Sequence, residues 1–502
     1  MKTKVILSIV VGLLIISLAA GAYWWWSRPQ VITFNDGTKL TLLGVEYGKR
    51  HAVPGGKPLP GSARIVRAAG PQLVPGPPNG NGSFSTLNDT LIVWVRTKYH
   101  SPTSQPGQPR QYRGFQLSVS DKDGTAFGFG FSPNMSDRPQ GDEILPILFD
   151  AFPRRAGKLT LRAREDYSGG EKTSDDEFVI SNPAAKMSFP KWTPEPLPDR
   201  ETNGDWTMTL TRLVAGVNLP SQTNSDNPDA ARNKGVQLTF HAERAGKPVT
   251  SWQLASVEIT DATGNRTGIN SWAKGASPVQ WNGDEGTFTY PNGLWPDEPA
   301  WKLRLEMTQT AGFSRDEQWT VQNIPVVPGG QQMLNAMAGM PDISMRGGVM
   351  VRNNLPAPTP CAETDLGGHH IKVFPAVQFT NNVRMRNLPA NFAPPQTALS
   401  IQIQPALIEN GMMLRNGPNG SQMADDRLHL TLAQVTDGQS GEIQAYSSGV
   451  NTSFMDATST ATYRFMLRDL AGVTNISATI ALHKNRVFEF TVKPQKARAG
   501  QP

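Results

Sequence analysis

The stretch KLRLE at positions 302–306 alternates charged residues with leucine, and a similar stretch, KLTLR, stands at positions 158–162. Successive side chains of a β-strand point to opposite faces of its sheet, so this period of two predicts strands with one buried face. Each stretch leads to a second alternating run, EFVI at 177–180 and QWTV at 318–321, and then to a proline. The sequence therefore predicts the same closing pair of strands twice.

A third such pair, YRFML at 463–467 and FEFTV at 488–492, lies near the C-terminus. Before each closing pair come two alternating runs and a glycine-containing turn: 91–95, 115–120 and 123–124; 236–240, 257–260 and 263–265; 399–403, 428–432 and 437–438. Glycine accepts the positive φ that a tight hairpin needs. We therefore expect an all-β fold of three tandem antiparallel β-sandwich modules.

Proline-rich stretches divide these copies, because proline lacks the backbone donor that a strand interior requires. The sequence predicts seven segments: 1–30, membrane anchor or signal segment; 31–185, β-sandwich 1; 186–204, proline-rich linker; 205–328, β-sandwich 2; 329–360, linker with a short helix at 331–340; 361–495, β-sandwich 3; and 496–502, tail. The proline-rich linker at 186–204 is expected to be stiff and extended.

The N-terminal segment predicts export. Two lysines precede an uncharged run at 5–26, which as a helix would rise about 33 Å and so cross roughly 30 Å of hydrocarbon. Early lysines favour a cytoplasmic N-terminus and an extracytoplasmic bulk. The apolar run exceeds the ~7–15 residues of a signal peptide core, which favours a retained anchor. Cleavage near Ala22, after the small residues at 20–22, is the alternative and would leave a secreted or periplasmic protein.

Composition fits an exported β protein without disulfides. Glycine (47) and proline (41) together make about 18% of the chain, above the usual ~12%, and Cys361 is its only cysteine. The net charge of +6 is scattered and forms no basic stripe, which argues against a nucleic-acid partner. We expect the membrane as one partner, through the N-terminal helix, and an envelope protein or a glycan as another.

The sequence contains none of the catalytic motifs Gly-x-Ser-x-Gly, His-Glu-x-x-His, Gly-Lys-Ser/Thr or Cys-x-x-Cys. Catalytic groups can also converge from distant loops, so this absence lowers the expectation of an enzyme without excluding one. The sequence favours a non-enzymatic protein and predicts no cofactor.

Trp272 and Trp281 are the candidate contact residues. They belong to an aromatic group in the second copy: Trp272, Trp281, Tyr290, Trp295 and Trp301. The first copy has an aromatic residue at the place of Trp295, which indicates packing, but none that matches Trp272 or Trp281. Exposed aromatics stack on sugars or anchor a protein partner. Beside Asp284 or Glu285, they would also suit an extracellular carbohydrate-binding or carbohydrate-active enzyme, which is the first alternative.

Cys361, His369 and His370 are the candidate metal ligands. Thiolate and imidazole groups bind zinc and copper, and two glycines precede the histidines. A periplasmic metal-handling protein is therefore the second alternative. However, adjacent histidines at the start of a strand point to opposite faces, which favours a structural role for them.

In strand count and alternation, these modules resemble the broad immunoglobulin-like and fibronectin-like class of β-sandwiches. With the apolar N-terminal segment, the chain resembles the uncharacterised, membrane-anchored bacterial envelope proteins that carry tandem modules of this kind. The resemblance implies one N-terminal transmembrane helix followed by modules with a structural or binding role towards protein or glycan. The chain has no Cys…Trp…Cys core pattern, so no residue role is carried over from that class.

Overall fold

The computed structural model describes residues 30–34, 37–52, 73–74, 83–98, 114–121, 125–127, 142–166, 173–218, 234–267, 279–290, 293–329, 333, 342–346, 349–353, 359–379, 396–407, 428–437, 441–453, 460–468, 470 and 472–497. The elements of this part are β-strands, apart from the 3₁₀ helix η4 (Arg315–Glu317), so the predicted all-β class is confirmed. No helix of the described residues is long and apolar enough to cross a membrane. The predicted anchor, before residue 30, and nearly all of the predicted short helix lie outside the described residues.

Two sheets form the N-terminal part of the fold, here called the N-terminal sheets. Their strand orders are β1-β2-β4-β3, with β6 beside β4, and β5-β7-β8. The bounds are β1 (Val31–Thr33), β2 (Lys39–Ala52), β3 (Leu73–Val74), β4 (Ser83–Lys98), β5 (Gly114–Ser120), β6 (Asp142–Phe149), β7 (Lys158–Asp166) and β8 (Thr173–Ser181). Leu159 and Leu161 of β7 share one buried cluster with Val93 of β4, as the alternation predicts.

Two further sheets, the central sheets, have the orders β15-β16-β11-β10-β30, with β9 on β10 and β12 on β11, and β14-β13-β17-β29. The bounds are β9 (Asp199–Asn203), β10 (Trp206–Asn218), β11 (Lys234–Arg244), β12 (Lys247–Pro248), β13 (Trp252–Asp261), β14 (Arg266–Thr267), β15 (Gln280–Asn282), β16 (Glu285–Tyr290), β17 (Trp301–Gln309), β29 (Arg486–Val492) and β30 (Gln495–Lys496). Leu303 and Leu305 of β17 are fully buried.

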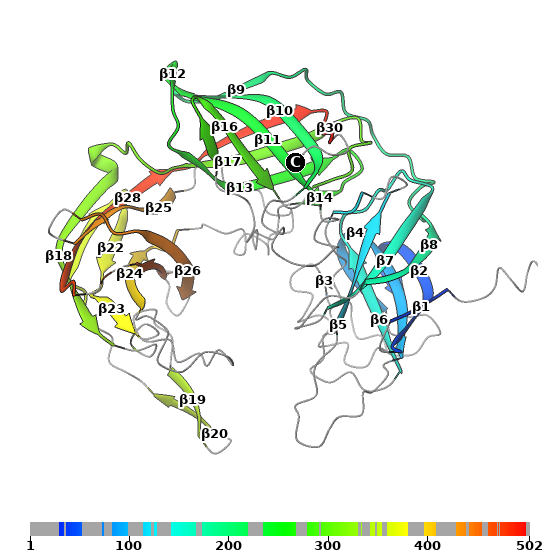
Figure 1. Ribbon diagram of the computed structural model, residues 1–502, viewed down its shortest axis with the longest axis horizontal. Coiled ribbons are helices and arrows are strands. Elements are labelled where there is room, and N and C mark those ends of the chain that lie inside the picture. Colours follow the sequence, from blue (N-terminus) through cyan, green and yellow to red (C-terminus); the bar gives the residue numbers. More distant parts are fainter. Residues whose placement is uncertain are drawn as a thin grey trace, which may run out of the picture.

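The remaining strands form a nine-stranded sheet of order β21-β22-β24-β23-β18-β28-β25, with β27 on β24 and β26 on β27, and a separate pair, β19-β20. The bounds are β18 (Gln318–Pro328), β19 (Asp342–Arg346), β20 (Val349–Asn353), β21 (Ala362–Leu366), β22 (His369–Val373), β23 (Ala376–Phe379), β24 (Gln396–Gln404), β25 (Leu428–Thr436), β26 (Ala445–Ser453), β27 (Thr460–Leu467) and β28 (Asn475–Lys484). The nine-stranded sheet has its own apolar cluster. The three groups follow one another along a curve (Figure 1).

Two strands belong to different sheets from those expected. β18, expected to close the second module, pairs with β28 in the nine-stranded sheet, with Val321 opposite Ala478. β29, expected to close the third module, pairs instead with β17 of the central sheets, where Phe490 lies opposite Leu303. The closing strands expected at the ends of 205–328 and 361–495 are thus exchanged. The chain leaves the central sheets after β17 and returns to them as the red strand among green ones (Figure 1).

One turn occurs in all three groups of sheets. In each case the carboxylate of an aspartate accepts a hydrogen bond from the amide four residues later, and the aspartate amide donates to that residue's carbonyl oxygen. The pairs are Asp121 with Thr125, Asp261 with Asn265 and Asp437 with Gly441. Aspartate favours such turns because its short side chain reaches nearby backbone groups. The recurrence agrees with the repeated turns in the sequence.

The proline-rich segment 186–204 lies against the central sheets and is not a free spacer. Its last residues form β9, which pairs with β10. Upstream, the amide of Glu195 donates to the carbonyl oxygen of Thr491 at 2.7 Å. Arg155 donates to the carbonyl oxygen of Pro190 at 2.6 Å. The segment is therefore held against the rest of the fold at three places along its length.

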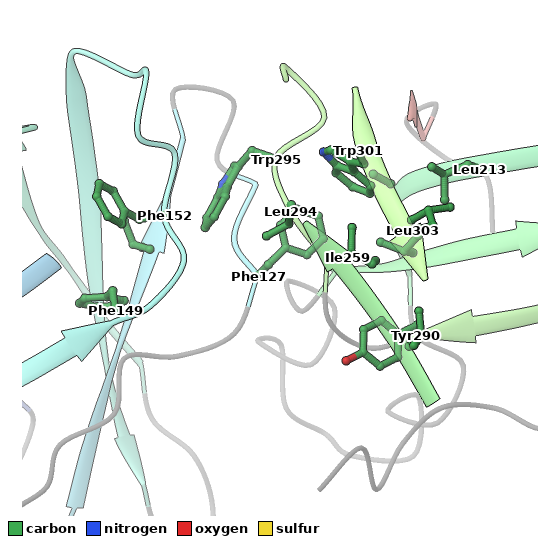
Figure 2. Packing of buried hydrophobic residues seen from close by; sticks show 14 of the residues in the cluster. Phe127, Phe149, Phe152, Leu213, Ile259, Tyr290, Leu294, Trp295, Trp301 and Leu303 are labelled. Carbon is green, nitrogen blue, oxygen red and sulfur yellow. The ribbon is translucent and has the colours of Figure 1, made fainter. Parts of the chain in front are cut away.

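Two of these aspartate turns, Asp121–Thr125 and Asp261–Asn265, lie where the N-terminal sheets meet the central sheets. On one side, the indole of Trp295 donates to the carbonyl oxygen of Thr125 at 2.9 Å, and its ring meets Phe127 edge-on. Figure 2 shows Phe127 and Trp295 between the two sheet groups, close to Leu294. The turn of the N-terminal sheets therefore contacts the central sheets directly.

On the other side of this joint, the turn of the central sheets contacts the N-terminal sheets. The side chain of Arg154 is buried and donates to the carbonyl oxygen of Thr263 at 2.6 Å. The guanidinium of Arg155 contacts the carboxylate of Glu298 at 3.0 Å. Burial raises the pKa of Glu298, although the hydrogen bond from Arg155 opposes that shift. Buried, hydrogen-bonded polar groups of this kind fix a single geometry, because leaving any of them unpaired is costly.

Candidate functional site

Trp281 packs on the central sheets. It lies in β15, is half-buried, and meets Phe240 edge-on with ring centroids 5.4 Å apart. Its indole nitrogen donates to the carbonyl oxygen of Trp252 at 3.3 Å. Gly286 leaves room for the ring, because a Cβ there would lie 3.0 Å from it. In these contacts, Trp281 packs against residues of the central sheets. Trp272 lies outside the described residues.

The carboxylates near Trp281 belong to an exposed hairpin turn. Asp284 lies in the turn between β15 and β16, and its carboxylate is 3.5 Å from Nδ1 of His241. Glu285 begins β16 and is also exposed. Glycosidases raise the pKa of one carboxyl group by burial or by a close second carboxylate. Asp284 and Glu285 are both exposed, so their burial adds no support for a carbohydrate-active site here.

The other aromatic residues of the second copy are buried. Tyr290, Trp295 and Trp301 are each at most 2% exposed. The interpretation of Trp295 as a packing residue is confirmed, although much of its contact is with the N-terminal sheets. That partner was not apparent from the sequence, because the alternation of one copy carries no information about its neighbour.

The three candidate metal ligands each form hydrogen bonds with different partners. His369 and His370 are consecutive in β22, and Nδ1 of His369 lies 2.8 Å from the carbonyl oxygen of Pro405. The thiol of Cys361 donates to the carbonyl oxygen of Val373 at 3.2 Å. Burial raises the pKa of Cys361, which disfavours the thiolate that a metal would need. In the part of the chain that the structure describes, no three His, Cys, Asp or Glu residues are arranged to hold a metal ion.

His370 instead lies between two carboxylates. Its Nδ1 is 2.9 Å from Oδ1 of Asp365, and its Nε2 is 3.0 Å from Oε2 of Glu363. The hydrogen bond with Asp365, followed by that with Glu363, raises the pKa of the imidazole. Because the carboxylates lie at different ring nitrogens, they favour a protonated imidazolium over a metal ligand. His370 was a candidate metal ligand in the sequence, and its two partners precede it there by five and seven residues.

A cavity of about 740 Å³ opens where the proline-rich segment meets the chain's C-terminal residues. Its walls come from residues 194–197, from Pro296 and Asp297, and from residues 493–496. Asp297 and Lys496 form an ion pair at 2.7 Å across part of the rim. Its volume lies within the ~300–1,000 Å³ typical of ligand sites. This cavity could not be predicted from the sequence, because the C-terminal residues reach it only through the pairing of β29 with β17.

One wall of the cavity carries a pair of carboxyl groups. Glu195 lines the cavity, and its side chain hydrogen-bonds to that of Asp199, which is buried at the start of β9. Burial raises the pKa of Asp199, and the charge and hydrogen bond of Glu195 raise it further. The lining residues thus combine carboxyl groups with the amines of Lys493 and Lys496.

Comparison with known proteins assigns no function to these residues. No protein-family model matches the chain, and no curated protein matches it at the level required for a relative.

Proposed function

We propose that the chain is a membrane-anchored extracytoplasmic protein whose β-sandwich modules form a scaffold with a structural or binding role. The N-terminal apolar run, long enough to cross a bilayer, supports the anchor. The aspartate turn that recurs at Asp121, Asp261 and Asp437 supports three modules of one kind. As a scaffold, the protein holds its surfaces at fixed positions outside the cytoplasm.

The hydrogen-bonded joint between the N-terminal and central sheets carries this proposal. A flexible spacer would leave neighbouring modules in loose contact, as domain interfaces within a chain often are. Here the buried guanidinium of Arg154 donates to a carbonyl oxygen of the neighbouring sheets, and Trp295 donates in the opposite direction. Such a joint keeps the relative orientation of its two parts, which a scaffold requires.

For the binding role, the cavity beside Glu195 is a concave surface among the described residues. Its prolines at 194, 196, 296 and 494 supply flat, rigid apolar walls, and Lys493 is exposed beside them. A rigid wall loses little conformational entropy when it is covered. A protein segment or a glycan with an acidic group would complement Lys493.

The anchor is tested by fractionating cells that express the full chain. Retention in the membrane after alkaline extraction, with the bulk of the chain accessible to external protease, is the expected result. Release by alkali, or a mature chain whose mass shows cleavage near Ala22, would contradict the anchor and leave a secreted or periplasmic protein.

The binding role is tested with residues 30–502 as bait against the envelope fraction of the host and on a glycan array. Specific retention of one protein or sugar is expected to weaken in Lys493→Glu. Lys247→Glu, the same change at an exposed residue of the short strand β12 that does not line the cavity, is the matched control. Binding that both variants reduce equally would remove the cavity from the proposal. Silence in both assays would leave only the structural role.

A further inference from the structure

The first described residue of the chain is tied to an edge of the N-terminal sheets. The side-chain amide of Gln30 donates to the carbonyl oxygen of Val179 at 3.0 Å, and its oxygen accepts from the amide of Val179 at 3.0 Å. Val179 lies in β8, the edge strand of its sheet. Gln30 thus pairs with this edge as a neighbouring strand would, and holds the start of β1 beside β8.

Exposed apolar side chains flank this contact. Val31 is 42% exposed and Val179 is 50% exposed, and among the described residues only Met187 joins them as an exposed large hydrophobic residue. An edge strand of a soluble protein is usually protected by charged side chains. Here Val179 of β8 stands beside the exposed Glu177, which pairs with Arg162, and Val31 of β1 lies on the other side of the Gln30 amide. We name this surface, made of Gln30, Val31 and Val179, the N-terminal rim.

Lysines lie close to the N-terminal rim in the strand register. Lys39 pairs with Thr33, two residues after Val31. Lys158 pairs with Ser181, two residues after Val179. Both lysines are exposed. Apolar side chains with lysines nearby suit the boundary between headgroups and acyl chains, where the lysines attract anionic lipid.

We propose that the N-terminal rim lies in the headgroup region of the bilayer that holds the N-terminal segment. This inference rests on the proposed function, because it needs that segment to be retained. The apolar run ends at Trp26, and the five residue steps from there to Val31 span at most about 18 Å. The rim is therefore bound to remain near the membrane surface, and the tether gives it a high effective concentration there.

This placement fixes the orientation of the whole scaffold. Because Gln30 joins the tether to β8, the N-terminal sheets cannot swing freely about the point where the chain leaves the bilayer. The hydrogen-bonded joint then passes this orientation on to the central sheets.

The test places an environment-sensitive fluorophore on the full chain in vesicles. In a Cys361→Ser background, the label is attached through Val179→Cys or, as the matched control, through Gln322→Cys, an exposed position on β18 of the nine-stranded sheet. The vesicles contain phosphatidylcholine with or without phosphatidylglycerol. We expect the emission at position 179 to shift to the blue and to be quenched by headgroup spin labels, more strongly with phosphatidylglycerol. We expect no shift at position 322.

Equal, water-like emission at both positions in a chain that resists alkaline extraction would overturn the inference and leave the anchor intact. Release of the chain by alkali would overturn both. A second variant, Gln30→Ala, keeps the valines but removes both hydrogen bonds. It is expected to reduce the quenching at position 179 without releasing the chain, and unchanged quenching would overturn the role given to Gln30.

Discussion

The side chain of Asn265 forms two hydrogen bonds with the backbone of Phe152, one to its carbonyl oxygen at 2.8 Å and one from its amide at 3.2 Å. Asn265 ends the aspartate turn of the central sheets, whereas Phe152 lies between β6 and β7 of the N-terminal sheets. Both residues are almost completely buried. One turn therefore closes a hairpin in one pair of sheets and fastens it to the next.

Asn265→Ala is expected to destabilise this joint. It removes both bonds to Phe152 and a further one to Asp261, and leaves buried backbone groups unpaired, which costs about 1–3 kcal/mol for each such group. We expect the protein to unfold at a lower denaturant concentration. We also expect a broader distribution of interatomic distances in small-angle X-ray scattering. Asn282→Ala, the same change at an exposed position in β15, is the control. A variant that loses stability but keeps the scattering profile would show that the joint does not hold the orientation.

Phe490→Ala tests the pairing of β29 with the central sheets. Removing a buried phenyl ring costs about 3–5 kcal/mol, and the ring of Phe490 is buried in the cluster shared with β17. Hydrogen exchange is therefore expected to accelerate in β13 and β17 and to stay slow in β28. Phe465→Ala in β27 is the matched control, with the reverse pattern expected. Faster exchange in β28 of the Phe490 variant would contradict the pairing described here.

His483 is expected to make stability fall in mild acid. Burial, followed by the nearby His429, lowers the pKa of His483 to about 4. Between the unfolded value of about 6.5 and this value, only the unfolded chain takes up the proton, so stability decreases by up to about 3 kcal/mol as the pH falls. Below pH 4 the effect is complete.

The measurement is the free energy of unfolding from pH 7 to pH 4. His483→Gln does not titrate and is expected to flatten this part of the profile, whereas His241→Gln at a half-exposed site controls for the substitution itself. An unchanged slope in His483→Gln would assign the acid sensitivity to other groups.

His370 is expected to titrate above the usual range of histidine, because Asp365 and Glu363 hold its protonated form. Its favourable contacts are present below the unfolded pKa and are lost as the pH rises through the folded one. In NMR titrations, the pair Glu363→Gln and Asp365→Asn should lower the midpoint of His370. Added zinc is expected to leave the resonance unshifted. A shift with zinc at neutral pH would revive the metal-handling alternative.

The strands themselves could be predicted from the sequence. In KLRLE at 302–306, both leucines are fully buried and Lys302 is exposed, as the alternation predicts. The repeated turns were predicted from their glycines, whereas the role of the aspartates at 121, 261 and 437 in closing them was not. The same alternation also misplaced two closing strands, since each was assigned to the run that precedes it in the chain.

The candidate functional surfaces were harder to predict from the sequence. Trp281 was chosen because it has no counterpart in the other copies, yet its irregular position reflects packing on Phe240. The cavity was missed because Glu195 and Lys496 lie 301 positions apart and approach only through β29 and β30. Residues that line such a surface carry no local pattern, because their neighbours are chosen by the folded chain.

The sequence by itself determined that this protein is built from strands and which face of many of them is buried, because a period of two in hydrophobicity is a local property of the chain. Only the tertiary structure decided that β29 completes the central sheets and β18 the nine-stranded sheet. Backbone hydrogen bonds can join any two strands with matching faces, so the partner is set by which arrangement buries all the apolar faces together. The joint, the cavity and the N-terminal rim all follow from that choice.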